Sequence, residues 1–279
     1  MTDYPLYDFG GEGTPLVLSL ANGFPPETYR HLLEPFTADY HVICVLPRAL
    51  WPDAPSPDSL DSWRDMAADL RAAIHAHGLA GGVGAGHSMG GVATMLATIS
   101  EPDLFRSIVL LDPTLLPPSY LIPMAVLNVF GMSHRAPVVE RASRRRSSFD
   151  SEQEAFDYWR GKSLFADWSD ETLWAYVHGI TTPNGSGVEL RWSPQWEARY
   201  FAKVPTWIWR EMPKLRNLLP MLFIQGDETN AFVEQSFRRI QRLVPEADYA
   251  QINGHGHLFP QSAPQQAADI MRAWLADYG

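Results

Sequence analysis

The order of short apolar runs and amphipathic stretches restricts the fold of this chain more than any other feature. Residues 16–21, 41–46 and, more weakly, 82–86 form short apolar runs bounded by turn residues, which predicts buried strands. Between them, residues 27–38 and 60–74 have the apolar spacing of helices. Strands that alternate with helices imply a mostly parallel sheet with helices on both faces. The predicted class is therefore α/β.

The alternation is interrupted in the middle of the chain. After a predicted helix over residues 89–99 and a predicted strand over 107–112, residues 113–218 are rich in proline, tryptophan and charge and contain no clear strand. A structureless loop of that length is unusual in a compact domain, so we expect a small helical subdomain.

The alternation then resumes. Strands are predicted over residues 221–225 and 248–252, and helices over 231–243 and 264–275. We therefore predict a core made of residues 1–112 and 219–279. Residues 113–218 would be inserted between two strands of its sheet.

Composition excludes several classes of protein. The 279 residues are 46% hydrophobic and 19% charged, which is a normal globular balance. The formal net charge of −10 argues against a nucleic-acid partner. The single cysteine, Cys44, excludes an intrachain disulfide and suits a cytoplasmic location. We see no secretory signal, and no apolar run approaches the roughly 20 residues of a membrane span.

Residues 86–91, Gly-His-Ser-Met-Gly-Gly, follow a predicted strand and open a predicted helix. The pattern Gly-x-Ser-x-Gly in this context indicates a nucleophile elbow, in which Ser88 is strained at the tip of a sharp turn. Side chains two residues before and after the serine would clash in so tight a turn, so both positions need glycine. The Met89 N–H at the helix start can donate to an oxyanion. His87 is interpreted as a structural residue.

With this elbow, the sequence resembles the α/β-hydrolase superfamily over nearly its whole length. The resemblance implies that the insertion is a cap that selects substrate. Residues 22–25, Asn-Gly-Phe-Pro, correspond to the family's His-Gly-x-Pro segment, with Asn22 in place of histidine. The resemblance implies that the Phe24 N–H is the second oxyanion donor. Because that donor is a backbone group, the change at Asn22 leaves it available.

The segment Gly-His-Gly-His-Leu-Phe-Pro at residues 254–260 resembles the family's Gly-x-Gly-His segment, which places the catalytic base at His257. Serine needs such a base because its hydroxyl is a poor nucleophile at neutral pH. His255 is the competing candidate. A His-x-His metal site is the other interpretation, but no Cys or His cluster supports it. We expect neither a metal nor a cofactor, since nucleotide and metalloprotease motifs are absent from the sequence.

The sequence does not decide which acidic residue would orient the base. Its usual position follows the strand after the insertion, but Thr229 stands there, and Asp227 lies one or two residues early. Pancreatic lipases and haloalkane dehalogenases, which are relatives, take the acid from the strand before the insertion, where Asp112 lies. We prefer Asp112 over Asp227, with Glu228 or no acid as the remaining alternatives.

The insertion contains seven of the ten tryptophans. Most of these rings are expected to form the subdomain's own core, while some would line an apolar pocket above Ser88. A cluster of arginines is expected to be a solvated face, with recognition of an anionic substrate group or a membrane surface as the alternative. The tryptophans are Trp159, Trp168, Trp174, Trp192, Trp196, Trp207 and Trp209, and the arginines are Arg141, Arg144, Arg145 and Arg146.

These observations predict an enzyme, a serine hydrolase of the carboxylesterase or lipase type. Ser88 would attack a small-molecule ester with an apolar group and form an acyl-enzyme, while His257 moves the proton. Serine at the elbow argues against epoxide hydrolases and haloalkane dehalogenases, which use aspartate there. Thioesterase, amidase, carbon–carbon bond hydrolase and perhydrolase chemistry remain alternatives, as does a ligand receptor with slow turnover.

Overall fold

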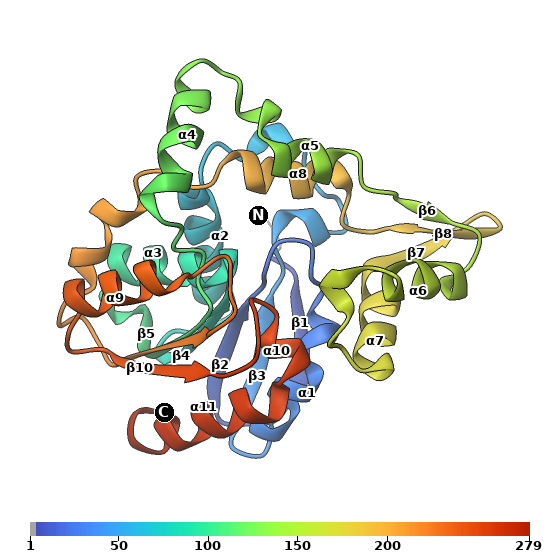
Figure 1. Cartoon of the computed structure of the whole chain (residues 1–279). Helices are drawn as coiled ribbons and strands as arrows, with labels where there is room; N and C mark the ends of the chain where they lie inside the picture. Colours follow the sequence, from blue (N-terminus) through green and yellow to red (C-terminus); the bar gives the residue numbers. More distant parts are fainter. Residues whose placement is uncertain (1–3) are drawn as a thin grey trace.

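A seven-stranded sheet forms the centre of the computed structural model, which describes residues 4–279 (Figure 1). Its strands are β1 (Leu6–Gly10), β2 (Thr14–Ser19), β3 (Tyr40–Val45), β4 (Gly82–His87), β5 (Phe105–Leu111), β9 (Met221–Gly226) and β10 (Asp248–Ile252). The spatial order is β1-β3-β2-β4-β5-β9-β10, and β1 alone runs antiparallel to its neighbour. The predicted α/β class with a mostly parallel sheet is confirmed.

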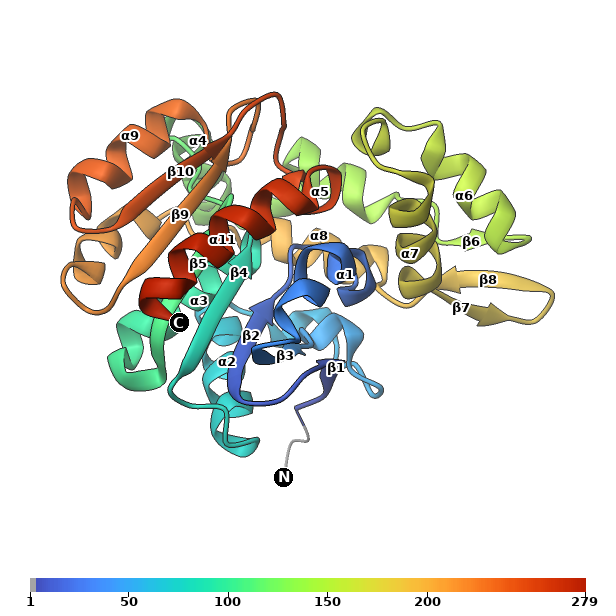
Figure 2. The same cartoon turned by 90° about the horizontal axis from the view of Figure 1, so that it is seen from below.

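Helices cover both faces of this sheet. In Figure 2, α1 and α11 lie together in front of the strands, with α2 and α3 behind them. Helices on both faces leave the parallel strands with few polar positions, and every residue of β4 is buried. The helices of this part are α1 (Arg30–Leu33), α2 (Trp63–Ala76), α3 (Met89–Ser100), α9 (Glu234–Leu243), α10 (Phe259–Ser262) and α11 (Pro264–Tyr278).

The helix predicted over residues 27–38 is broken into three pieces. A 3₁₀ turn at Pro26–Tyr29 leads into α1, and a second 3₁₀ turn at Glu34–Phe36 follows it. Pro35 explains the second break, because proline has no N–H to donate to the carbonyl four residues earlier.

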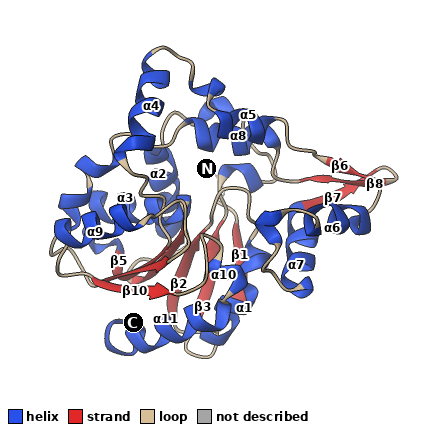
Figure 3. Ribbon diagram, in the orientation of Figure 1, coloured by secondary structure: helices blue, strands red, loops and turns tan. Residues whose placement is uncertain are grey.

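The segment between β5 and β9, called the insertion below, contains the predicted helices and also a small antiparallel sheet (Figure 3). Its elements are α4 (Pro118–Val129), α5 (Pro137–Ser143), α6 (Glu152–Arg160), α7 (Asp170–Ile180), α8 (Pro194–Ala202), β6 (Ser148–Phe149), β7 (Thr181–Asn184) and β8 (Gly187–Leu190). Its strands pair in the order β6-β8-β7. Strands of two to four residues are too short for a visible alternation, and Pro183 is tolerated because β7 is an edge strand. The sequence therefore did not indicate this sheet.

The tryptophans of the insertion are largely core residues. Trp159, Trp168, Trp192, Trp196 and Trp209 are buried, whereas Trp174 and Trp207 are partly buried against the same core. No helix within residues 4–279 combines the length and apolar character needed to cross a bilayer.

Candidate active site

Ser88 occupies a sharp turn between β4 and α3. Its backbone has φ 57° and ψ −117°, which lies outside the regions that L-residues normally adopt. A side chain at Gly86 would place its Cβ 2.6 Å from the Gly90 carbonyl oxygen, and one at Gly90 would reach 2.1 Å from the Ser19 carbonyl oxygen. The expectation that both positions require glycine is thus met by the geometry.

Backbone strain in this chain is concentrated near Ser88. Among residues 4–279, the non-glycine residues with positive φ are Ser88, Asp112 and Asn217. Each such conformation costs on the order of 1–3 kcal/mol and persists only where the surrounding structure enforces it. The backbone at Ser88 and at Asp112 is therefore held in a strained conformation at a cost in stability, and both side chains lie at the candidate site.

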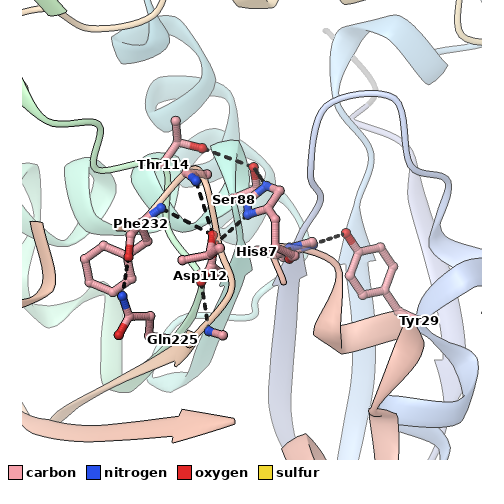
Figure 4. A network of polar contacts seen from close by, with 11 residues as sticks. Tyr29, His87, Ser88, Asp112, Thr114, Gln225 and Phe232 are labelled. Atoms are coloured by element: carbon pink, nitrogen blue, oxygen red, sulfur yellow. Dashed lines mark hydrogen bonds and ion pairs between the residues drawn. The ribbon is translucent and has the colours of Figure 1, made fainter. Parts of the chain in front are cut away.

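The side chains of Ser88, His257 and Asp112 form one continuous chain of hydrogen bonds (Figure 4). His257 Nε2 lies 2.8 Å from Ser88 Oγ, and His257 Nδ1 lies 2.6 Å from Asp112 Oδ2. Because a carboxylate only accepts, Nδ1 carries the proton and Nε2 is free to accept the serine hydroxyl proton. This arrangement can make the serine oxygen a nucleophile.

Asp112 is fully buried and its carboxylate is satisfied on both sides. Oδ1 accepts from the Gly226 N–H at 3.0 Å, and Oδ2 accepts from the Thr229 hydroxyl at 2.5 Å as well as from His257. Thr229, which stands at the other position considered for the acid, thus donates to the carboxylate that follows the neighbouring strand β5. These three donors leave neither oxygen of the buried carboxylate without a hydrogen-bond partner.

The two alternative acids lie elsewhere. Asp227 Oδ1 accepts from the Gly254 N–H at 2.7 Å and is exposed, so it stabilises the loop before His257 rather than the ring. Glu228 is also exposed, and its backbone N–H donates to the His255 carbonyl. Within residues 4–279, Asp112 is the carboxylate that contacts His257.

His255 points to a different partner. Its Nδ1 lies 3.1 Å from the Ser262 hydroxyl. No group of three His, Cys, Asp or Glu side chains in the described part of the chain is arranged to hold a metal ion.

A second buried network connects the elbow to the base, and the sequence did not reveal it. The Tyr29 hydroxyl lies 2.8 Å from His87 Nδ1, and His87 Nε2 lies 2.9 Å from the His257 carbonyl oxygen (Figure 4). Since a carbonyl only accepts, Nε2 carries the proton and Nδ1 accepts from Tyr29. Burial, and then the neighbouring His257, hold the pKa of His87 well below its usual value, so the ring is neutral. Because Tyr29 also accepts from the Ala21 N–H, the network joins the loop after β2, the end of β4 and the loop that carries His257.

Thr114 is a further neighbour of the serine that the sequence analysis missed. Its Oγ1 lies 3.0 Å from Ser88 Oγ, and its N–H donates to the Ser88 carbonyl at 3.1 Å. When the serine hydroxyl donates to His257, the threonine hydroxyl is left to donate to Ser88 Oγ. The available signal was its position two residues after Asp112, at the end of a strand beside β4.

The two backbone N–H groups predicted to bind an oxyanion differ in whether they already donate a hydrogen bond. The Met89 N–H is the first of α3 and has no intrahelical acceptor, as for any helix start. The Phe24 N–H donates to the Ala21 carbonyl at 3.3 Å, a long bond within a turn in which Gly23 has φ 82°. Their role at an oxyanion stays a prediction.

Arg145 lies beside this turn and is not a solvated side chain. It pairs with Glu197 at 2.6 Å and donates to the Tyr176 hydroxyl. A Cβ built on Gly23 would lie 3.5 Å from Arg145 Nη1, and Asn22 Nδ2 donates to the Glu197 carbonyl. The insertion is thus held against the predicted oxyanion loop.

The neighbouring arginines behave as expected of a solvated face. Arg144 pairs with Glu140 at 3.4 Å and Arg146 with Glu154 at 2.7 Å, and all four side chains are exposed. Of the three consecutive arginines, only Arg145 lies close to the site.

Residues 19–270 match the model of a family described as "Alpha/beta hydrolase family". A protein of Acinetobacter baylyi named (E)-2-((N-methylformamido)methylene)succinate hydrolase is 25% identical over 271 residues, covering 95% of this chain and 91% of the relative. The sn-1-specific diacylglycerol lipase ABHD11 of Mus musculus is 24% identical over 228 residues, covering 80% and 68%.

The fold is also similar to solved structures. The crystal structure of E-2-(acetamidomethylene)succinate hydrolase superposes with a TM-score of 0.81 at 15% identity, covering 97% of this chain and 94% of the other. At that level of identity the similarity shows the fold alone.

Proposed function

Because this chain belongs to the alpha/beta hydrolase family, we propose that it is a serine hydrolase that cleaves a carboxylic ester with an apolar group through an acyl-enzyme. The observation that carries this proposal is the chain of hydrogen bonds from Ser88 Oγ through His257 to the buried Asp112. Serine, histidine and carboxylate in this order and at these distances are the parts that acyl transfer needs.

In the first half of the reaction, Ser88 Oγ attacks the ester carbonyl carbon while His257 Nε2 takes the hydroxyl proton. Asp112 holds Nδ1–H and stabilises the imidazolium that forms. The Met89 and Phe24 N–H groups would stabilise the negative charge on the carbonyl oxygen, which for Phe24 requires its long turn bond to weaken. The alcohol then leaves with the proton from His257.

In the second half, water attacks the acyl carbon and His257 takes its proton. The bond to Ser88 Oγ breaks, and negative charge develops on that oxygen. Thr114, whose hydroxyl lies 3.0 Å away, would stabilise the departing oxygen until His257 returns the proton.

Aromatic rings around Phe24 support an apolar substrate. The Phe24 ring centroid lies 5.9 Å from that of Trp168 and 5.8 Å from that of Tyr176, both in the insertion. Trp168 and Tyr176 are buried, whereas Phe24 is only partly buried, so an apolar acyl or alcohol group entering over Phe24 would bury its surface against the Phe24 ring.

A carboxylate-bearing amide is the second candidate substrate, because the Acinetobacter baylyi relative is named for such a compound. Arg145 beside Gly23 is the observation that favours it, since guanidinium binds carboxylate in bidentate geometry. Glu197 already neutralises this charge at 2.6 Å, so an anionic substrate would have to compete with it. For this reason the apolar ester is preferred.

A substrate panel with active-site labelling tests the proposal. The protein and its Ser88→Ala variant would be assayed on p-nitrophenyl esters of increasing chain length, matching thioesters and amides, and N-acyl aminomethylene succinates. We expect turnover of esters that rises with acyl length, and fluorophosphonate labelling that Ser88→Ala abolishes. Turnover confined to the carboxylated amides would favour the second candidate. Tight ligand binding with negligible turnover would contradict the proposed enzyme and favour a ligand receptor.

A further inference from the structure

The outer face of α4 is apolar and exposed. Within residues 4–279, five of the seven exposed large apolar side chains lie between residues 120 and 130. Val129 is 82% exposed and Phe130 is 69% exposed. Scattered exposed apolar residues are normal, but a contiguous group marks an interaction site. The group is Tyr120, Ile122, Val126, Val129 and Phe130.

The spacing of three of these residues places them on one side of the helix, and Phe130 follows directly after its last residue. Ile122, Val126 and Val129 recur at i, i+4 and i+7, and share a face. The opposite side contacts the rest of the insertion through the buried Leu121 and Met124. A surface helix normally has a polar outer face, but α4 contains no charged residue at all. Its outer face is therefore suited to an apolar environment.

Two arginines without an ion partner in the described part of the chain lie near this helix. Residues 113–149 contain five arginines, of which Arg144, Arg145 and Arg146 pair with Glu140, Glu197 and Glu154. Arg135 lies in the 3₁₀ turn Ser133–Arg135, which contacts α4. Arg141 lies in α5, whose Val139 and Ala142 pack with Met124 of α4. Arg135 and Arg141 are exposed and make no ion pair within residues 4–279.

The position of α4 makes the face reachable by a flat surface. In Figure 1, α4 stands at the top of the molecule beyond α5 and α8, and it projects away from the central sheet. Its first residue, Pro118, comes four residues after Thr114, which contacts Ser88. A surface that contacts α4 would therefore lie against the segment that leads directly from Thr114 into the insertion.

We propose that α4 docks this protein onto the surface of anionic phospholipid membranes, with its apolar face in the interface and Arg135 and Arg141 on the lipid headgroups. This inference rests on the proposed function, since it supplies the source of an apolar ester. Apolar side chains flanked by arginine are the features that bind such an interface. A second copy of the chain fits less well, because a two-fold contact through α4 would bring the arginines of both copies together.

Co-sedimentation with phospholipid vesicles tests the proposal. We expect the protein to bind vesicles of phosphatidylcholine with phosphatidylglycerol, and to bind pure phosphatidylcholine or any vesicle at high salt more weakly. The double variant Val129→Ser/Phe130→Ser should weaken binding by about tenfold or more, because it removes two exposed apolar side chains that would enter the membrane interface. Leu164→Ser is the matched control, since Leu164 is 58% exposed on another part of the insertion.

The arginines have their own variant. Arg135→Gln/Arg141→Gln should weaken binding to the anionic vesicles and leave binding to pure phosphatidylcholine unchanged. The control is Arg242→Gln, an exposed arginine at the end of α9. If Arg242→Gln weakened vesicle binding as much as Arg135→Gln/Arg141→Gln does, the general charge of the protein, and not this face, would bind the vesicles.

Two results would overturn the docking role. One is vesicle binding that Val129→Ser/Phe130→Ser leaves unchanged. The other is an absence of vesicle binding, and a dimer that the same variant dissociates in the ultracentrifuge would then assign this face to a second copy. Turnover of a dissolved p-nitrophenyl ester is measured on every sample. Normal turnover without vesicle binding refutes the docking role alone, whereas vesicle binding without turnover or fluorophosphonate labelling refutes the proposed function alone.

Discussion

Replacing Asp112 by asparagine should abolish most activity because it moves the proton of His257 from Nδ1 to Nε2. Asp112 Oδ1 faces the Gly226 N–H at 3.0 Å, so the oxygen of an asparagine amide would stay on that side. The amide NH₂ would then face His257 Nδ1, at the position where Oδ2 now lies 2.6 Å away. His257 would have to accept there and carry its proton on Nε2, facing Ser88. It could no longer take the serine proton.

The expected loss in kcat is about 10⁴-fold, or about 5.5 kcal/mol of transition-state stabilisation, the size of effect seen when a triad histidine is held in the wrong tautomer. The assay is steady-state hydrolysis of a p-nitrophenyl ester, with thermal unfolding to show that the variant is folded. Asp227→Asn is the matched control, because that side chain only accepts from the Gly254 N–H and an amide oxygen can replace it. A large loss in Asp227→Asn with near-normal activity in Asp112→Asn would refute the assignment.

Further predictions concern the neighbours of the reacting serine. Thr114→Val should slow deacylation by about tenfold, seen as a burst followed by a slower steady state, and Thr114→Ser should not. Tyr29→Phe should lower the free energy of unfolding in urea by about 2 kcal/mol, because it leaves two buried polar groups without a partner; Tyr278→Phe, at an exposed ring, should not. The lowered pKa of His87 means that the unfolded chain binds a proton which the folded chain does not, so stability falls as the pH drops below about 6.5. Between pH 6.5 and 5.5, the free energy of unfolding should fall by about 1 kcal/mol more in the wild type than in His87→Gln. An equal fall in both proteins would contradict a neutral His87.

The central strands could be predicted because buried parallel strands are read from local apolar runs. The strand predicted at residues 248–252 coincides with β10, and the elbow follows from glycines whose Cβ positions are occupied by backbone. Both features depend on residues that are close together in the sequence.

The start of α2 shows the limit of such local signals. The helix pattern begins at residue 60, but the cap is Ser62, which forms a capping box with Asp65, and the helix begins at Trp63. Several polar residues precede the apolar positions, and the sequence alone does not say which side chain turns back onto the backbone.

The surroundings of Asp112 could not be predicted, because they depend on which strands are neighbours. β5 and β9 pair in parallel, and the Asp112 N–H donates to the Ile224 carbonyl at 2.8 Å. That pairing brings Gly226 and Thr229 to the carboxylate across more than a hundred residues of sequence. The order of elements along the chain does not show which strands are neighbours, so the sequence alone leaves the choice of acid open.

The most direct test of the central claim is to trap the acyl-enzyme. The protein would be mixed with an excess of a p-nitrophenyl ester, quenched in acid within the first turnover, digested and mapped by mass spectrometry. We expect the mass of one acyl group on the peptide that contains Ser88, and none in Ser88→Ala. Steady ester turnover with no acyl group on Ser88, or with the group on another residue, would contradict the account.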